Sequence, residues 1–171
     1  MTKPLCALAA VLALTPSLVE RAPAQSPSRA PANLDQLMRG TLYPESNVIF
    51  AAQDTNPADI PHAKDPNMST DLLTSSYGKW DAVENSALAI VEVASLLDIP
   101  GRKCANGVDV PVTDPNWTKW VQGLRDAGMA AYAAAKSKDQ DKITDAAGVL
   151  TIACKNCHDR YREKRMDNRC K

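Results

Sequence analysis

The sequence predicts an all-α fold, an antiparallel four-helix bundle, from three observations. Four stretches repeat apolar residues at i, i+3 and i+4, the spacing of a helix with one buried face. Alanine is plentiful and only 5% of the 171 residues are aromatic, a composition that favours close helix contacts over an all-β sandwich. No stretch of useful length alternates apolar and polar residues as a half-buried strand does.

The charge balance and the cysteine count exclude two broad classes of protein. Lys and Arg together number 20, Asp and Glu also number 20, and the formal net charge is zero. A nucleic-acid-binding domain would carry a basic surplus, so no nucleic-acid partner is expected. The 5 cysteines are too few for a disulfide-dense miniprotein. The chemistry of the chain must therefore come from a local motif.

Residues 1–24 have the pattern of a secretory signal peptide. A positively charged start precedes an apolar run at 5–14, and the small residues of 22–24 fit a cleavage site. The run is too short to span a bilayer, so we expect no stable membrane span, with a retained N-terminal anchor as the alternative reading. Residues 25–32, with two Pro and two Ser, are expected to form a flexible leader, and residues 33–171 form the functional domain.

The first predicted helix begins at Asn33, a residue type that favours the N-cap position. Pro44 lacks a backbone N–H and disfavours helix at the residue before it, so we expect a break there and a second short piece to about Gln53. Residues 54–69, rich in Pro, Asn and Asp, have no periodicity and predict a long surface connection. The apolar face of this helix consists of Leu34, Leu37, Met38 and Leu42.

The second predicted helix begins near Ser69 and Thr70 and is ended by Pro100 and Gly101. A polar loop that contains Cys104 follows it. The apolar face of this helix is expected to consist of Leu73, Tyr77, Trp80, Val83, Ala87, Ile90, Val91, Ala94 and Leu97.

Asp114 and Pro115 open the third predicted helix as N-cap and first-turn proline. Gly123 and Gly128 weaken its helix propensity but permit the close approach of a flat ligand or of another backbone, as in plain helix packing. The inward stripe of this helix consists of Trp117, Trp120, Val121, Leu124, Gly128, Ala131, Ala134 and Ala135.

The fourth predicted helix runs from about Asp139 to Lys164. It places Cys154 and Cys157 on its inward stripe, near the end of the helix. The same stripe carries Ile143, Ala146, Ala147, Leu150, Ala153 and Tyr161.

The motif that carries chemistry is Cys154-Lys155-Asn156-Cys157-His158. The pattern C-x-x-C-H is the attachment signature of haem c. Two thiols three residues apart lie on one side of a helix, where both can add to the two vinyl groups on one edge of a porphyrin. The histidine that follows the second thiol is then placed to bind the iron. The sequence therefore predicts one covalently attached haem c, with His158 as a ligand of its iron.

Three other readings of the motif fit the sequence less well than haem attachment. A thioredoxin-like C-x-x-C follows a strand and opens a helix, whereas this one comes late in a predicted helix. A zinc site needs four ligands, which the remaining Cys and His residues formally supply, but no second close pair of cysteines exists. A disulfide between Cys154 and Cys157 would be sterically awkward in a regular helix.

The chain resembles cytochrome c prime and its low-spin relatives. Beside the C-x-x-C-H motif, the resemblance rests on His158-Asp159-Arg160-Tyr161-Arg162 after it and on three further segments. These segments are Leu37-Met38-Arg39-Gly40, Trp80-Asp81-Ala82-Val83-Glu84-Asn85 and Ile99-Pro100-Gly101-Arg102.

The resemblance implies a periplasmic bundle with haem c held among the helices. Cys154 and Cys157 would form the thioethers, and His158 would be the axial ligand. Members of the family either leave the second iron face open to small gases or close it with a methionine of the first helix. The long connection after Pro44 and the loop around Cys104 depart from the shorter prime-type pattern.

Met38 is the candidate for the second iron ligand. By periodicity alone it is core filler beside Leu34 and Leu37, but its thioether is a suitable soft ligand, and the family places such a methionine in the first helix. Of the other candidates, Met68 lies at a loop–helix junction, Met129 faces a polar side of its helix, and His62 is a loop residue.

Two functions stay open, and neither is enzymatic, because no substrate site or acid–base pair is apparent in the sequence. The first is single-electron transfer with redox proteins of the periplasm as partners. The second is a five-coordinate haem protein that binds gases such as NO or CO. Whether the bundle forms a homodimer also stays open.

Cys104 and Cys170, both expected outside helices of an exported protein, are predicted to form a disulfide, with free thiols or intermolecular pairing as the alternative.

Overall fold

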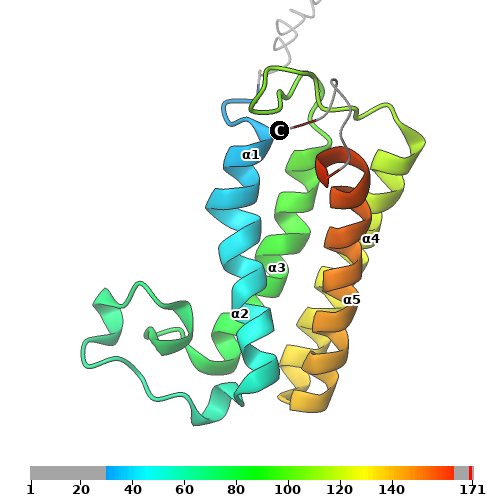
Figure 1. Cartoon of the computed structure of the whole chain (residues 1–171). Helices are drawn as coiled ribbons and strands as arrows, with labels where there is room; N and C mark the ends of the chain where they lie inside the picture. The colour runs from blue at the N-terminus through cyan, green and yellow to red at the C-terminus, as the bar shows by residue number, and fades with distance from the viewer. Residues whose placement is uncertain (1–29, 164–169, 171) are drawn as a thin grey trace, which may run out of the picture.

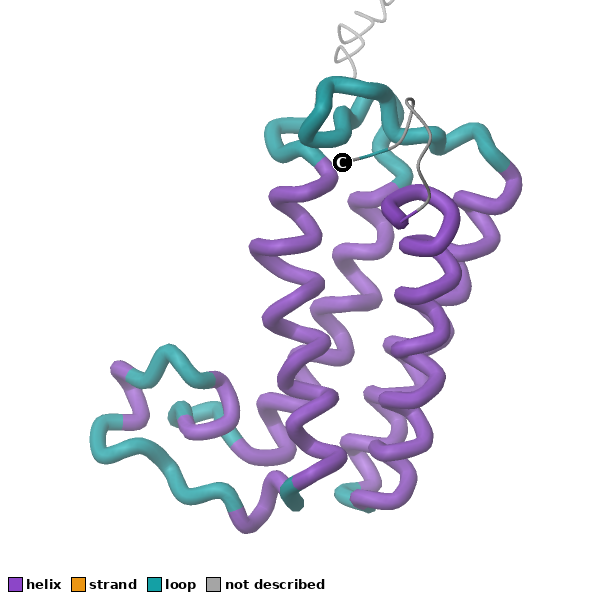
Figure 2. Tube along the Cα trace, viewed as in Figure 1, coloured by secondary structure: helices purple, strands orange, loops and turns teal. Residues whose placement is uncertain are grey.

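The computed structural model describes residues 30–163 and residue 170. The predicted signal peptide at 1–24 and residues 25–29 of the leader lie outside the described residues. Within the described residues the chain is helical, without a β-strand, and it forms the predicted four-helix bundle (Figure 2). No described helix combines the length and the apolarity that a bilayer crossing requires.

Four long helices run alternately up and down the bundle (Figure 1). The first is continuous but has three parts, α1 (Leu34–Leu37), the π-helical turn η1 (Met38–Leu42) and α2 (Tyr43–Asp54). It is followed by α3 (Lys79–Leu97), α4 (Pro115–Ser137) and α5 (Gln140–His158), which continues as a second π-helical turn, η5 (Asp159–Glu163). Helix α4 packs between α3 and α5, and α2 packs against both α3 and α5.

The first helix begins as predicted but does not break at Pro44. The side chain of Asn33 accepts a hydrogen bond from the backbone N–H of Gln36, and the side chain of Gln36 accepts one from the backbone N–H of Asn33, which completes a capping box. Pro44, which lacks an N–H, is accommodated by the π-helical turn that precedes it. In this turn the N–H of Tyr43 donates to the carbonyl oxygen of Met38, five residues earlier. The predicted break at Pro44 is therefore wrong, because a wider turn accommodates the proline.

The connection between α2 and α3 is longer than predicted. It contains three short 3₁₀ turns, η2 (Pro57–Asp59), η3 (Pro66–Met68) and η4 (Leu72–Thr74), and projects from one end of the bundle (Figure 1). The predicted helix start near Ser69 and Thr70 is wrong, because Asp71 caps the turn η4 instead of opening a helix. A Cβ at Gly78 would lie 2.3 Å from the carbonyl oxygen of Leu73, so only glycine fits the corner that precedes α3.

Two residues of the predicted apolar face therefore come from this connection rather than from a helix. Leu73 still reaches the core, where it is 8% exposed. Tyr77 was expected on the same buried face and is 76% exposed, so that part of the prediction is wrong. The prediction of a buried helical face was therefore correct only from Trp80 onward.

Helices α3 and α4 approach closely at Gly128. A Cβ there would lie 2.7 Å from Cγ2 of Val91 and 3.2 Å from the carbonyl oxygen of Ala87. A Cβ at Gly123 would meet nothing within 4 Å. The close approach predicted for the glycines is thus confirmed at Gly128, where it serves helix packing, and not at Gly123.

The ends of the last two helices agree with the sequence. Asp114 caps α4 through its side chain, as predicted, and Asp139, the predicted start of the last helix, caps α5 in the same way. Helix α5 ends at His158, and η5 carries the helical path to Glu163, while Lys164 lies outside the described residues. The two π-helical turns thus begin at Met38 and directly after His158.

Candidate functional site

A mainly apolar, open pocket lies where the first helix begins and α5 ends. Residues from the first helix, α4, the end of α5, η5 and the tail contribute to it, so the pocket forms only when segments far apart in the sequence pack together. It is lined by Leu34, Asp35, Met38, Trp117, Cys157, His158, Tyr161, Arg162 and Cys170.

The last turns of α5 carry the C-x-x-C-H motif. Cys154 and Cys157 are half-buried free thiols that pack against the hydrophobic core, one helical turn apart. Burial raises the pKa of Cys154, and it raises the pKa of Cys157 to about 12, with a smaller contribution from the neighbouring Cys154. Both thiols are therefore protonated at neutral pH. A reactive redox thiol has a lowered pKa, so this environment speaks against the thioredoxin-like reading.

The zinc reading finds no support in the described part of the chain. No three His, Cys, Asp or Glu residues gather there in a way that could hold a metal ion. Cys104 is bonded to Cys170, so these two cysteines cannot complete a site with Cys154 and Cys157. Within the described residues the motif does not form the four-ligand arrangement that structural zinc requires.

Met38 and His158 line the same pocket. Both are half-buried, and they come from opposite ends of the chain. The other candidates do not line this pocket: Met68 is 76% exposed and Met129 is 48% exposed. His62 is exposed, with Nδ1 2.8 Å from the carbonyl oxygen of Ser75. The structure thus brings together one methionine and the histidine of the motif, and ligation by Met38 stays a prediction.

An aromatic group closes the pocket on the side of α4. Tyr161 packs edge-on against Trp117 and Trp120, with ring centroids 5.0 and 5.5 Å apart. Its hydroxyl donates a hydrogen bond to Oδ2 of Asp114 at 2.8 Å. Nη2 of Arg160 lies 3.4 Å from the same oxygen. These contacts connect the turn after His158 to the N-terminus of α4.

Sequence reasoning assigned Asp114 only to capping and did not find this contact. The pKa of Asp114 is lowered, first by the hydrogen bond from the backbone N–H of Asn116 and then by that from Tyr161. The pKa of Tyr161 is raised to about 12, first by burial and then by the hydrogen bond to Asp114. The two residues are 47 positions apart, and no local pattern in the sequence indicates that they meet.

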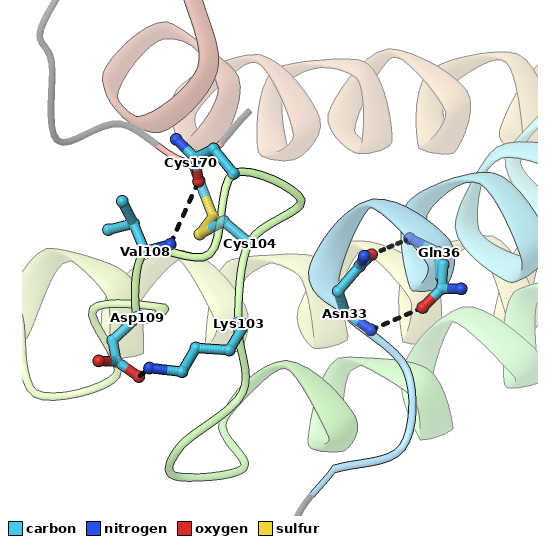
Figure 3. Close-up of a disulfide and its surroundings, with 8 residues drawn as sticks. Asn33, Gln36, Lys103, Cys104, Val108, Asp109 and Cys170 are labelled. Carbon is cyan, nitrogen blue, oxygen red and sulfur yellow. Dashed lines mark hydrogen bonds and ion pairs between the residues drawn. A yellow bond between two sulfur atoms is a disulfide. The ribbon is translucent and has the colours of Figure 1, made fainter.

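The predicted disulfide between Cys104 and Cys170 is present (Figure 3). It joins the loop between α3 and α4 to the tail, and Cys170 lines the pocket. The same loop holds the first helix, because the N–H of Leu34 donates to the carbonyl oxygen of Lys103 at 2.8 Å. Buried Arg102 donates from Nε to the carbonyl oxygen of Leu96 at 2.9 Å and from Nη1 to that of Ala32. The loop is therefore bonded to two residues that line the pocket, Cys170 and Leu34.

Comparison with known proteins gives one match. Residues 114–162, which span α4, α5 and most of η5, match the family model described as Cytochrome C'. No curated protein and no solved structure matches the chain significantly. The matched segment contains the C-x-x-C-H motif, Trp117, and both partners of the contact between Asp114 and Tyr161.

Proposed function

We propose, because residues 114–162 match the Cytochrome C' family model, that this chain is a periplasmic electron carrier with one covalently bound haem c. The observation that carries the proposal is the shared pocket of Met38, Cys157 and His158. It combines an attachment thiol and two side chains suited to iron in one apolar environment. A thioether sulfur and an imidazole nitrogen are the ligand pair of low-spin electron carriers of this kind.

The residues present fit a haem c. Cys154 and Cys157 are free thiols that lie one helical turn apart on a half-buried face, which suits thioether formation with two vinyl groups of one ring edge. His158 follows directly and lines the pocket, so its imidazole would bind the iron. When bound, the haem supplies the one-electron redox couple.

The protein around the motif would keep water from the iron and hold the imidazole in place. Leu34 and Trp117 form buried, mainly apolar parts of the pocket wall. The contact between Tyr161 and Asp114 restrains the turn that follows His158. Met38, on the first helix, would bind the second face of the iron and raise the reduction potential.

The proposed role also implies where the protein is located and which partners it has. A signal peptide at 1–24 would deliver the chain to the periplasm, where the other cysteines can pair, and the disulfide between Cys104 and Cys170 suits that oxidising compartment. Its partners would be redox proteins that exchange single electrons with it. The role needs no substrate site, so we do not propose an enzymatic activity.

The test is the absorption spectrum of the reduced holoprotein with and without CO. We expect a six-coordinate, low-spin spectrum that CO leaves unchanged. In Met38→Ala the sixth position opens, so the reduced spectrum should become high-spin and should shift with CO. Met129→Ala is the control, because Met129 does not line the pocket.

Other outcomes of this test would change the proposal. A wild-type protein that is high-spin and shifts with CO would support gas binding instead of electron transfer. An unchanged spectrum in Met38→Ala would remove Met38 as the ligand. A colourless protein with its bare peptide mass, made in a host that attaches haem c, would overturn the whole proposal.

A further inference from the structure

The indole of Trp117 contains a buried donor without a partner. Trp117 is 1% exposed, and its Nε1 makes no hydrogen bond. A buried tryptophan N–H usually has an acceptor, because it has given up its hydrogen bonds to water. Two other buried side-chain atoms in the described residues lack a partner, on Ser86 and Asp98, and neither residue lines the pocket. The unpaired donor that belongs to the pocket is therefore the one on Trp117.

The position of this indole is fixed by its neighbours. The ring of Tyr161 packs edge-on against it, with the centroids 5.0 Å apart. Tyr161 is itself held by its hydrogen bond to Asp114, which caps the helix that carries Trp117. Because Trp117 is buried and closely packed, rotation of the indole to reach water would disturb this group. The donor is thus preorganised for an acceptor that enters the pocket.

We propose that Trp117 is a further haem-binding residue, whose indole N–H donates a hydrogen bond to a propionate carboxylate of the haem. The inference rests on the proposed function. The nitrogens of a haem are bound to its iron, and thioether sulfurs are weak acceptors, so the propionates are the strong acceptors that a haem brings. His158 is excluded as the acceptor, because an imidazole bound to iron through one nitrogen carries a proton on the other.

The charges of the pocket are consistent with a carboxylate that needs a neutral donor. Arg162 and Asp35 line the pocket and have opposite charges. The other titratable groups that line it are His158, the thiol of Cys157, which would be a thioether in the holoprotein, and the hydroxyl of Tyr161, which is engaged with Asp114. The N–H of Trp117 would donate a hydrogen bond to a propionate in this pocket and would add no charge to it.

The test follows the indole N–H signals in holoprotein labelled with ¹⁵N-tryptophan. The protein is reduced and saturated with CO, so that the iron is diamagnetic whether or not Met38 binds it. The chain has 3 tryptophans, and the signal that disappears in Trp117→Phe belongs to Trp117. We expect this signal to shift with pH along the titration curve of a carboxyl group. The titration must persist in Asp35→Asn, since Asp35 is the other carboxylate that lines the pocket.

The second readout is the pH dependence of the reduction potential. Trp117→Phe should raise the pKa associated with the propionate by about one unit, a tenfold change in proton affinity, because the anion loses a donor. Trp120→Phe is the matched control, since Trp120 packs against the same tyrosine at 5.5 Å but does not line the pocket. It should leave the titration unchanged.

Three results would overturn the inference. The Trp117 signal of a coloured holoprotein could fail to titrate, or its titration could vanish in Asp35→Asn, and in either case the proposed function would stand. Equal effects of Trp117→Phe and Trp120→Phe on the potential would show a role in packing alone. A protein without haem would instead refute the proposed function on which the inference rests.

Discussion

The hydroxyl of Tyr161 donates a hydrogen bond to Oδ2 of Asp114 at 2.8 Å, and this contact joins the turn after His158 to the cap of α4. The same carboxylate accepts from the backbone N–H of Asn116 through its other oxygen, at 2.9 Å. One side chain therefore caps the start of α4 and restrains the segment beyond the C-x-x-C-H motif. The pairing connects the capping of α4 to the geometry of the candidate site.

This contact predicts a loss of stability at alkaline pH. The pKa of Tyr161 is raised from 10.0 to about 12 in the folded protein, mainly by burial and then by Asp114. A raised pKa contributes stability that is fully present below pH 10 and is lost as the pH rises toward 12. Tyr161→Phe should remove this part of the pH dependence and lower stability at neutral pH. Urea unfolding of both proteins at several pH values measures the effect.

The matched control is Tyr132→Phe. Tyr132 is also half-buried, and its ring lies under Nζ of Lys136 at 5.5 Å. This variant should keep the alkaline dependence of the wild type. Identical alkaline profiles for wild type and Tyr161→Phe would show that the phenol of Tyr161 ionises in the folded state as freely as in the unfolded state.

A second prediction compares two glycines of the same helix. Gly128→Ala would place a Cβ 2.7 Å from Cγ2 of Val91, a stiff β-branched side chain, and 3.2 Å from the backbone oxygen of Ala87. We expect it to lower the free energy of unfolding by about 1–3 kcal/mol, because overpacking separates α3 from α4. Gly123→Ala meets open space and should raise the free energy of unfolding by about 0.5–1 kcal/mol through helix propensity. Thermal or urea unfolding of the two variants measures both changes, and equal effects would contradict the close packing at Gly128.

These elements also show which parts of the fold were predictable from sequence. The caps at Asn33, Asp114 and Asp139 were predictable because each depends on bonds to backbone groups only two or three residues away. The C-x-x-C-H motif was equally local, since its spacing alone places both thiols on one helix face. Local chemistry therefore determined where most helices begin and where the motif lies.

The errors arose where distant or non-helical contacts decide the structure. The start of α3 was misplaced because helical spacing continued through Leu73, while Asp71 and Gly78 build a turn and a corner instead. The contact between Asp114 and Tyr161 was missed because only the assembled bundle brings the two residues together. By contrast, the disulfide between Cys104 and Cys170 was predictable without their distance, because both cysteines were expected outside helices of an exported protein.

A third prediction concerns the disulfide between Cys104 and Cys170. It closes a loop with a sequence separation of 66. Its removal in a Cys104→Ala/Cys170→Ala variant should lower the free energy of unfolding by about 4 kcal/mol, because the unfolded chain regains the entropy of that loop. Urea unfolding of the holoprotein measures this loss. A matching loss on mild reduction of the wild type would confirm its origin, whereas unchanged stability would mean that the loop is held by its other contacts, such as that of Lys103 with Leu34.

A fourth prediction concerns Pro44, which we expect to set the position of Met38. In Pro44→Ala the new N–H can donate to the carbonyl oxygen of Gly40, so the π-helical turn Met38–Leu42 can relax to an α-helical one. Loss of the extra residue in that turn would rotate Met38 by about 100° relative to α2 and turn it away from the pocket. The first helix is held at its start by the hydrogen bond between Leu34 and Lys103, so the rotation would strain that contact.

The readout for Pro44→Ala is again the spectrum of the reduced holoprotein under CO. If Met38 binds the iron, a high-spin fraction that shifts with CO should appear, although the thioether side chain itself is intact. Pro66→Ala is the control, because Pro66 lies in the turn η3, away from the pocket. A Pro44→Ala spectrum identical to that of the wild type, combined with the expected response of Met38→Ala, would mean that the π-helical turn is maintained by the packing of the first helix rather than by the proline. The width of this turn would then be a property of the assembled bundle, as the contact between Asp114 and Tyr161 is at the other wall of the pocket.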